Sequence, residues 1–213
     1  MEADTDVLVD FNNVTFSYDD DKNVVENLSF SIKKGEHVTL SGRTGAGKST
    51  IFKLLLGLYD PDNGSVLIAG QKATAIPDSE KRKVYGYVEQ TFHMVPGTVK
   101  DQITLYDTLI TDEDVIEAAK TAGLHDAIME LENGYDTICK PEDFSQGQWQ
   151  LLSIARAAAA KPELLLLDEI TANLDADTEK NVLDALNRVS ENRTVISISH
   201  RTNARTGRII EIA

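Results

Sequence analysis

The feature that most constrains what this chain can fold into is a glycine-rich octapeptide at residues 42–49, Gly-Arg-Thr-Gly-Ala-Gly-Lys-Ser. It follows a strand-like run at residues 37–40 and precedes a helix-like stretch at residues 49–58. In this order the glycines let backbone N–H groups turn inward around phosphate groups, and the helix presents the positive end of its dipole to them. The sequence therefore predicts a phosphate-binding loop on an α/β sheet.

The loop predicts a role for each of its reactive side chains. Lys48 would reach the β- and γ-phosphates of a nucleotide, and the hydroxyl of Ser49 would hold Mg2+. The alternative, a glycine-rich turn with a surface lysine, is disfavoured because a strand and a helix flank the loop where the mechanism needs them. The residues of this segment that we expect at the nucleotide are Gly42, Arg43, Thr44, Gly45, Ala46, Gly47, Lys48, Ser49 and Thr50.

Two acids, Asp168 and Glu169, follow the aliphatic run at residues 164–167. Ligands of open α/β sheets bind at the carboxyl ends of the strands, so Asp168 is placed to serve Mg2+. Glu169 is placed to orient or deprotonate a water molecule, a role usually worth about 10²- to 10⁴-fold in rate. An acidic turn after a strand is common by itself, and it is the pairing with the glycine loop that favours the catalytic interpretation.

The remaining pattern is β structure first, then helices, then β structure again. The expected strands are 14–18, 28–32, 37–40, 66–68, 84–88, 164–167, 195–198 and 208–212, the first two joined by an acidic turn at 19–21. Residues 98–160 are expected to be helical, with Thr111 and Asp114 as a capping pair. A further helix at 177–189 would separate two strands of a βαβ unit, which implies parallel pairing.

Composition excludes several classes of protein. The chain of 213 residues has 21 basic and 35 acidic residues, a formal net charge of -14, which disfavours binding along a nucleic-acid backbone. Cys139 is the single cysteine, so an internal disulfide or a cysteine metal cluster is excluded. No run approaches the roughly 20 apolar residues that span a bilayer, and acids follow Met1 instead of a signal sequence. We therefore expect a soluble, unexported chain.

The string Phe-Ser-Gln-Gly-Gln at residues 144–148 makes the assignment specific. It resembles the Leu-Ser-Gly-Gly-Gln signature of ATP-binding cassette (ABC) proteins, and nearly the whole chain is similar to the nucleotide-binding domain of ABC transporters. The motifs also occur in that family's order: Tyr18, the glycine loop, Gln90, the signature, Asp168 with Glu169, residues 173–175, and His200. Residues 97–101, 118–120 and 134–137 resemble the exporter branch of the family.

The resemblance implies an α/β fold: a P-loop NTPase (RecA-like) core with an N-terminal antiparallel β subdomain and an inserted α-helical subdomain. We expect a single ABC ATPase domain over residues 1–213. Residues 1–90 and 161–213 would form the catalytic core with the β subdomain, and residues 91–160 the helical subdomain that carries the signature.

The resemblance also implies roles for single residues. Tyr18 would stack on adenine, where the alternative is a half-buried strand tyrosine. Gln90 would reach Mg2+ and the attacking water, where the alternative is turn polarity, and His200 would lie near the γ-phosphate instead of serving only in packing. The expected catalytic residues are Glu169, His200, Lys48 and Gln90, and the expected Mg2+ ligands are Ser49, Gln90 and Asp168.

In this family the signature acts on the nucleotide of a second subunit. Ser145, Gly147 and Gln148, with the positive end of their helix, would bind the γ-phosphate held by the partner, and Asp175 would belong to a loop at the dimer interface. The implied partners are a second ABC ATPase domain, identical or homologous, in a head-to-tail dimer, and a transmembrane domain of a transporter. The implied cofactors are ATP and Mg2+, the implied location is the cytoplasmic face of the cell membrane, and no nucleic acid is expected.

Two departures from the family pattern carry expectations. Gln146 replaces the first signature glycine and adds a side chain near the opposite site, so we expect weaker or slower closure on ATP. Thirteen residues follow His200, and exporters commonly carry their membrane domain upstream on the same polypeptide. Two arrangements stay open: the chain is an excised domain of a longer exporter, or its membrane domain belongs to a separate chain.

Other functions fit less well. A DNA repair ABC protein needs a long coiled coil between the halves of the site, and a translation factor carries two cassettes in one chain; this sequence has neither. A regulatory module that binds nucleotide without turnover is disfavoured because Lys48, Asp168, Glu169 and His200 are intact.

Overall fold

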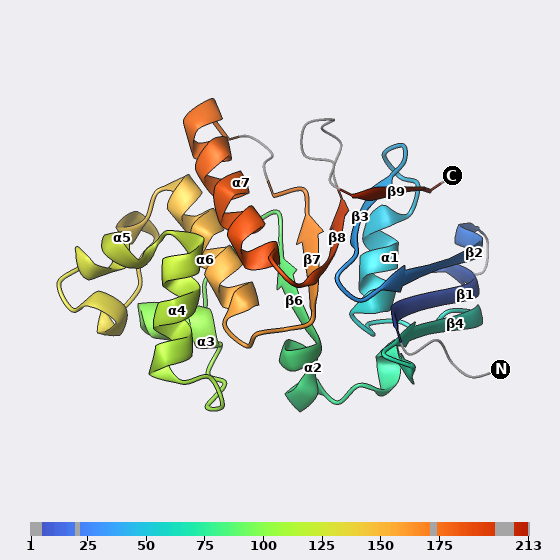
Figure 1. The fold of residues 1–213 in the computed structure, drawn as a ribbon, viewed down its shortest axis with the longest axis horizontal. Coiled ribbons are helices and arrows are strands. Elements are labelled where there is room, and N and C mark those ends of the chain that lie inside the picture. Colours follow the sequence, from blue (N-terminus) through green and yellow to red (C-terminus); the bar gives the residue numbers. More distant parts are fainter. Residues whose placement is uncertain (1–5, 20–21, 171–173, 199–206, 213) are drawn as a thin grey trace. The chain divides into compact units, whose positions relative to one another are not determined.

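The computed structural model describes residues 6–19, 22–170, 174–198 and 207–212, in two compact units (Figure 1). One unit comprises residues 1–81 with 194–213, and the other comprises residues 82–193. The first contains β1 (Val7–Ser17), β2 (Asn23–Lys33), β3 (His37–Ser41), α1 (Lys48–Leu55), β4 (Asn63–Ile68), β5 (Gln71–Lys72), η1 (Ala73–Ala75), β8 (Thr194–Ile198) and β9 (Arg208–Glu211).

The N-terminal strands of the first unit form an antiparallel sheet in the order β2-β1-β4-β5. In its register Phe11 pairs with Phe30 of β2, and their rings stack with centroids 4.5 Å apart. On the other side of β1, Val9 pairs with Ile68 of β4, and both side chains are buried. The predicted antiparallel pair is confirmed, although β1 and β2 are longer than the strands expected at residues 14–18 and 28–32.

A second set of strands in this unit is parallel and carries the glycine loop. β3 lies between β8 and β9 and pairs in parallel with both. Four of its five residues, Val38 to Ser41, are buried. A strand that is buried on both faces shows no alternation of apolar and polar residues, and this strand carries only apolar and hydroxyl side chains at these positions. The chain leaves β3 through residues 42–47 and enters α1, which is the predicted order of strand, loop and helix.

The second unit combines two parallel strands with helices. It contains β6 (Tyr85–Val88), α3 (Val99–Thr104), α4 (Asp112–Ala122), α5 (His125–Met129), η2 (Gly134–Asp136), η3 (Pro141–Asp143), α6 (Gln146–Ala158), β7 (Leu164–Asp168) and α7 (Ala176–Ser190). β6 and β7 pair in parallel. α6 packs against α3, α4 and α7, so this helix is the centre of the unit (Figure 1).

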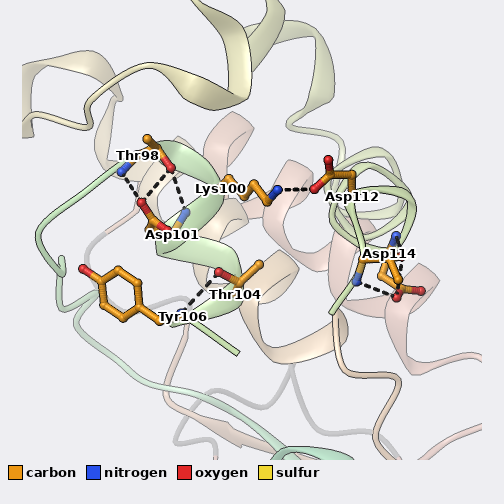
Figure 2. Close-up of polar contacts among 8 residues, drawn as sticks. Thr98, Lys100, Asp101, Thr104, Tyr106, Asp112 and Asp114 are labelled. Atoms are coloured by element: carbon orange, nitrogen blue, oxygen red, sulfur yellow. Dashed lines mark hydrogen bonds and ion pairs between the residues drawn. The ribbon is translucent and has the colours of Figure 1, made fainter. Parts of the chain in front are cut away.

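Local caps set where these helices begin. Thr98 and Asp101 form a capping box on α3, and Thr111 and Asp114 form one on α4, as predicted (Figure 2). Figure 2 also shows the ion pair of Lys100 with Asp112, which joins the start of α3 to the start of α4.

The sequence did not indicate α2 (Asp78–Val84), which spans the boundary of the two units. The helix buries none of its residues, so it has no apolar stripe to detect. Val84, expected at the start of a strand, is its last residue, and β6 begins at Tyr85. The helix expected to run to Leu58 ends at Leu55, because Gly57 turns the chain with φ 65°.

Candidate functional site

The glycine loop wraps around the amino group of Lys48. This side chain is buried, and its Nζ donates hydrogen bonds to the carbonyl oxygens of Gly42 at 2.8 Å and Arg43 at 3.0 Å. Gly47 caps α1 with φ 88°, and a Cβ at this position would lie 2.8 Å from the carbonyl oxygen of Val24. Glycine is required there both by the left-handed backbone and by the close approach of β2.

A cavity of about 890 Å³ opens beside this loop. Its volume lies within the range of roughly 300–1,000 Å³ typical of small-molecule sites. The cavity brings together an aromatic ring, the glycine loop, two cationic side chains (Lys22 and Arg43) and two acidic ones (Asp19 and Glu211). The ring and the loop are the features that a nucleotide needs. It is lined by Tyr18, Asp19, Lys22, Asn23, Val24, Gly42, Arg43, Thr44, Gly45, Ala46, Glu211 and Ile212.

Tyr18 stands at one end of this cavity and is anchored by its neighbours. Its ring is 44% exposed, and its hydroxyl lies 3.2 Å from Oγ1 of Thr50. Phe16 and Tyr59 meet the ring edge to face, with centroids 5.0 and 5.4 Å away. Nζ of Lys53 lies 5.1 Å from the ring centroid. An exposed, oriented aromatic ring on a cavity wall is suited to stacking on a base.

The acidic pair at the end of β7 has a partner that sequence reasoning missed. The hydroxyl of Tyr87 in β6 donates to Oδ2 of Asp168 at 3.1 Å. Burial raises the pKa of Asp168, the Tyr87 bond opposes that rise, and the charges of Glu169 and Glu89 add to it. Burial and the Asp168 charge in turn raise the pKa of Tyr87 above its usual range. The strand pattern at residues 84–88 could have indicated this contact, because alternation along a strand places Tyr85 and Tyr87 on the same face.

Glu169 adopts a left-handed backbone conformation with φ 45°. This conformation is strained for a residue with a Cβ, at a cost of about 1–2 kcal/mol, and such residues cluster at functional sites.

The predicted magnesium ligands were tested by their chemistry. Ser49, Gln90 and Asp168 offer hydroxyl, amide and carboxylate oxygens, the donors that Mg2+ prefers alongside substrate phosphates. A cation would offset the burial and acidic neighbours that raise the pKa of Asp168, so the set fits the ion. Among the described residues no group of three His, Cys, Asp or Glu side chains could hold a metal by itself. The magnesium site stays a prediction.

The signature residues lie at the N-terminus of α6, where the three-residue separation of Ser145 and Gln148 suits a capping box. Ser145 is the N-cap: its Oγ accepts from the Gln148 amide at 3.3 Å, and its own amide donates to Oε1 of Gln148 at 2.8 Å. Gly147 is buried in the first turn, whereas Gln146 is exposed. Gln90 lies two residues beyond the end of β6, and its carbonyl oxygen accepts from Nε2 of Gln150 at 2.9 Å.

A groove of about 500 Å³ lies between the segment after Gln90 and the signature helix. Trp149 packs between Phe92 and Phe144, with ring centroids 4.9 and 5.2 Å away. In the part of the chain that is described, Oε1 of buried Gln150 has no hydrogen-bond partner. The lining residues are Gln90, Thr91, Phe92, Met94, Pro141, Phe144, Gln146, Trp149 and Gln150.

The other predicted site residues are placed as follows. Asp175 is the N-cap of α7 and accepts from the Thr178 amide at 3.0 Å. His200 and Asn173 lie outside the described residues. The structure thus brings Tyr18 together with the loop in the first unit, and Gln90 together with the signature in the second. No helix among the described residues has the length and apolar character needed to cross a membrane.

Comparisons with known proteins agree on one relationship. Residues 25–172 match the family model described as "ABC transporter". The chain is 40% identical over 197 residues to the "Uncharacterized ABC transporter ATP-binding protein YfiC" of Bacillus subtilis (strain 168), covering 92% of this chain and 33% of that protein. It is 39% identical to the "Alpha-hemolysin translocation ATP-binding protein HlyB" of Escherichia coli O157:H7, covering 91% and 28%.

A solved structure matches as well. The "Structure of a bacterial Atm1-family ABC exporter with ATP bound" superimposes with a TM-score of 0.84 and 34% sequence identity, covering all of this chain and 38% of the other. The chain spans about a third or less of the length of the two curated relatives.

Proposed function

Because this chain belongs to the ABC transporter family, as an ATP-binding domain of the exporter type, we propose that it hydrolyses ATP to ADP and phosphate and thereby drives substrate movement across a membrane. The fold predicted for such a domain is confirmed by the match to the exporter structure. A DNA repair or translation factor is not supported, since the relatives named above are transporter proteins.

The observation that carries the proposal is the continuous cavity from Tyr18 to the glycine loop. Adenine stacks on the Tyr18 ring, and the phosphates extend along residues 42–46 toward Lys48. Amide groups of the loop donate to the phosphate oxygens, and the N-terminus of α1 adds a favourable dipole. Nζ of Lys48 donates to two carbonyl oxygens of the loop, which holds its charge within the segment that the phosphates follow.

Hydrolysis is assigned to the acidic pair. Glu169 orients and deprotonates the attacking water, with Gln90 and His200 assisting at the γ-phosphate. Ser49, Gln90 and Asp168 would hold Mg2+, which would neutralise charge that develops on the phosphates. The Tyr87 hydroxyl binds Oδ2 of Asp168 and thereby orients the carboxylate.

The active unit is a head-to-tail dimer with an identical or homologous domain. Ser145, Gly147 and Gln148 lie at the start of α6, and Asp175 lies at the start of α7, so two helix N-termini carry the residues assigned to the partner's nucleotide. Gln146 is exposed at the same helix start, and we keep the expectation that it slows closure.

The membrane partner is a transmembrane domain, on the same polypeptide or on another chain. The relatives are about three times as long as the matched segment, which leaves room for such a domain. The aromatic groove beside Gln90 offers it an apolar docking surface. Residues 1–213 then act as one ATPase domain at the cytoplasmic face of the cell membrane.

The test uses the Glu169→Gln variant, which should trap the closed state. With Mg-ATP, light scattering after size exclusion should give a mass near twice 23.4 kDa, and neither ADP nor Lys48→Ala should do so. A monomer under every condition, despite measurable ATP binding, would remove the homodimer from the proposal. Absence of phosphate release from the unmodified chain, together with intact dimer formation, would instead favour a regulatory module.

A further inference from the structure

Gly147 of the signature packs directly against a side chain of its own subunit. A Cβ at position 147 would overlap the Cγ2 methyl group of Thr178 in α7. The Cβ and Oγ1 atoms of Thr178 would lie 3.6 and 3.7 Å from it, at ordinary van der Waals distance. The methyl group alone therefore excludes a side chain at position 147. α6 and α7 pack side by side at this point (Figure 1).

The α7 cap holds the backbone of Thr178 where its methyl group meets Gly147. Oδ1 of Asp175 accepts from the Thr178 amide at 3.0 Å, which caps α7. Because the cap fixes the backbone, relief of the overlap requires the Thr178 side chain to leave the rotamer it adopts here.

We propose that Thr178 is a positioning residue that holds the signature at a fixed distance from Asp175 at the start of α7, and that glycine is required at position 147 by this contact within the subunit. The proposal rests on the proposed function, since both ends of the contact carry residues assigned to the partner's nucleotide. A shift of α7 would move Ser145 and Asp175 together, so the two interface elements respond as one body.

This explanation competes with another that predicts the same glycine. If the partner's γ-phosphate must approach the backbone of position 147, glycine is required whatever residue stands at 178. The two explanations predict different results for a variant in which the methyl group of Thr178 is removed. Thr178→Ser does this and keeps the hydroxyl, so that of the three nearest atoms only those at 3.6 and 3.7 Å remain.

The experiment compares Gly147→Ala, Thr178→Ser and the double variant, all in the Glu169→Gln background. Thr121→Ser, at a partly exposed position of α4, is the matched control for the methyl deletion. ATP-driven dimer formation is measured by light scattering, and nucleotide binding to the monomer is measured with a fluorescent ATP analogue. Thermal unfolding is recorded for every variant.

Gly147→Ala should lose dimer formation by tenfold or more while the monomer still binds the analogue, and the melting temperature should fall by several degrees. The double variant should recover dimer formation and most of the melting temperature. If the double variant recovered its melting temperature but did not form dimers, the inference would be overturned. The same holds if the double variant lost dimer formation as fully as Gly147→Ala. Either result would support the explanation in which the partner's γ-phosphate requires the glycine.

Failure of the proposed function is separable from failure of this inference. If the Glu169→Gln chain does not dimerise with ATP, the proposal of a head-to-tail homodimer fails. The melting temperatures then decide whether Thr178 requires glycine at position 147. Without the clash, alanine should raise the melting temperature, because it forms helix better than glycine. A rise in the Gly147→Ala variant would overturn the inference, and a fall reversed by Thr178→Ser would support it.

Discussion

The hydroxyl of Tyr18 lies 3.2 Å from Oγ1 of Thr50, which joins the exposed ring at the cavity wall to the third residue of α1. Thr50 is buried, so this contact restrains the ring. The ends of the cavity proposed to bind the base and the phosphates are thereby connected to the same helix.

Truncation of the ring should weaken nucleotide binding strongly. Tyr18→Ala removes the stacking surface, and stacking of a base on an aromatic side chain contributes about 1–3 kcal/mol. The dissociation constant of ATP should rise roughly 5- to 150-fold in a titration with a fluorescent analogue. Tyr18→Phe keeps the ring and loses only the hydroxyl, so it should cost about tenfold or less. Equal losses for both variants would place the effect in the hydroxyl and not in stacking.

Tyr59 should act through Tyr18. Its ring meets Tyr18 edge to face at 5.4 Å, and such pairs contribute about 0.5–1.5 kcal/mol. Tyr59→Leu should therefore raise the dissociation constant of ATP by about 2- to 12-fold, with kcat unchanged. Tyr59→Phe, which retains the ring, is the control and should bind as the unmodified chain does. If Tyr59→Leu changed kcat and left binding alone, the ring would have a different role.

Removal of the Tyr87 hydroxyl should shift the acidic limb of the pH profile. The bond from Tyr87 favours the ionised form of Asp168, whose pKa is already raised by burial. In Tyr87→Phe the pKa of Asp168 rises further, so more alkaline conditions are needed to ionise it. The acidic limb of kcat/KM for ATP hydrolysis should move to higher pH, whereas Tyr85→Phe, in the same strand, should leave it in place. A shift to lower pH in Tyr87→Phe would contradict the assignment.

Neutralising Asp168 should stabilise the fold and abolish hydrolysis. Burial raises the folded pKa of this acid above its ordinary value of 3.8, so its ionisation destabilises the folded state. Asp168→Asn should therefore melt at a higher temperature than the unmodified chain at pH 7. The difference should be complete above the folded pKa and vanish below about 3.8, where both chains are neutral at this position. A difference that does not change with pH would assign the gain to packing.

The capping box on α4 should contribute measurably to stability. Oγ1 of Thr111 accepts from the Asp114 amide at 3.2 Å, and the Asp114 carboxylate accepts from the Thr111 amide at 3.1 Å. Thr111→Ala should cost about 1 kcal/mol, which corresponds to a fall of roughly 2–4 °C in melting temperature. Thr111→Ser keeps the oxygen and should retain most of that stability. Equal melting temperatures for the alanine and serine variants would show that the box is not stabilising.

What the sequence predicted correctly is local. The caps at Thr111 and Ser145 depend on residues three positions apart, and the glycine loop is contiguous, so both could be recognised from neighbouring letters. Contacts between distant segments could not, because no pattern in the sequence records them. Tyr87 meets Asp168 across 81 residues, and Thr178 meets Gly147 across two helices. The helix α2 was missed because it buries nothing.

Trp149 is the single tryptophan of the chain, and it lies in the groove between Phe92 and Phe144, beside the signature. Indole emission depends on the polarity of the surroundings, and every other part of the chain is silent at the excitation wavelength selective for tryptophan. The protein thus carries its own optical probe at the surface assigned to the membrane domain. Docking at that surface can be followed in unlabelled protein, in real time.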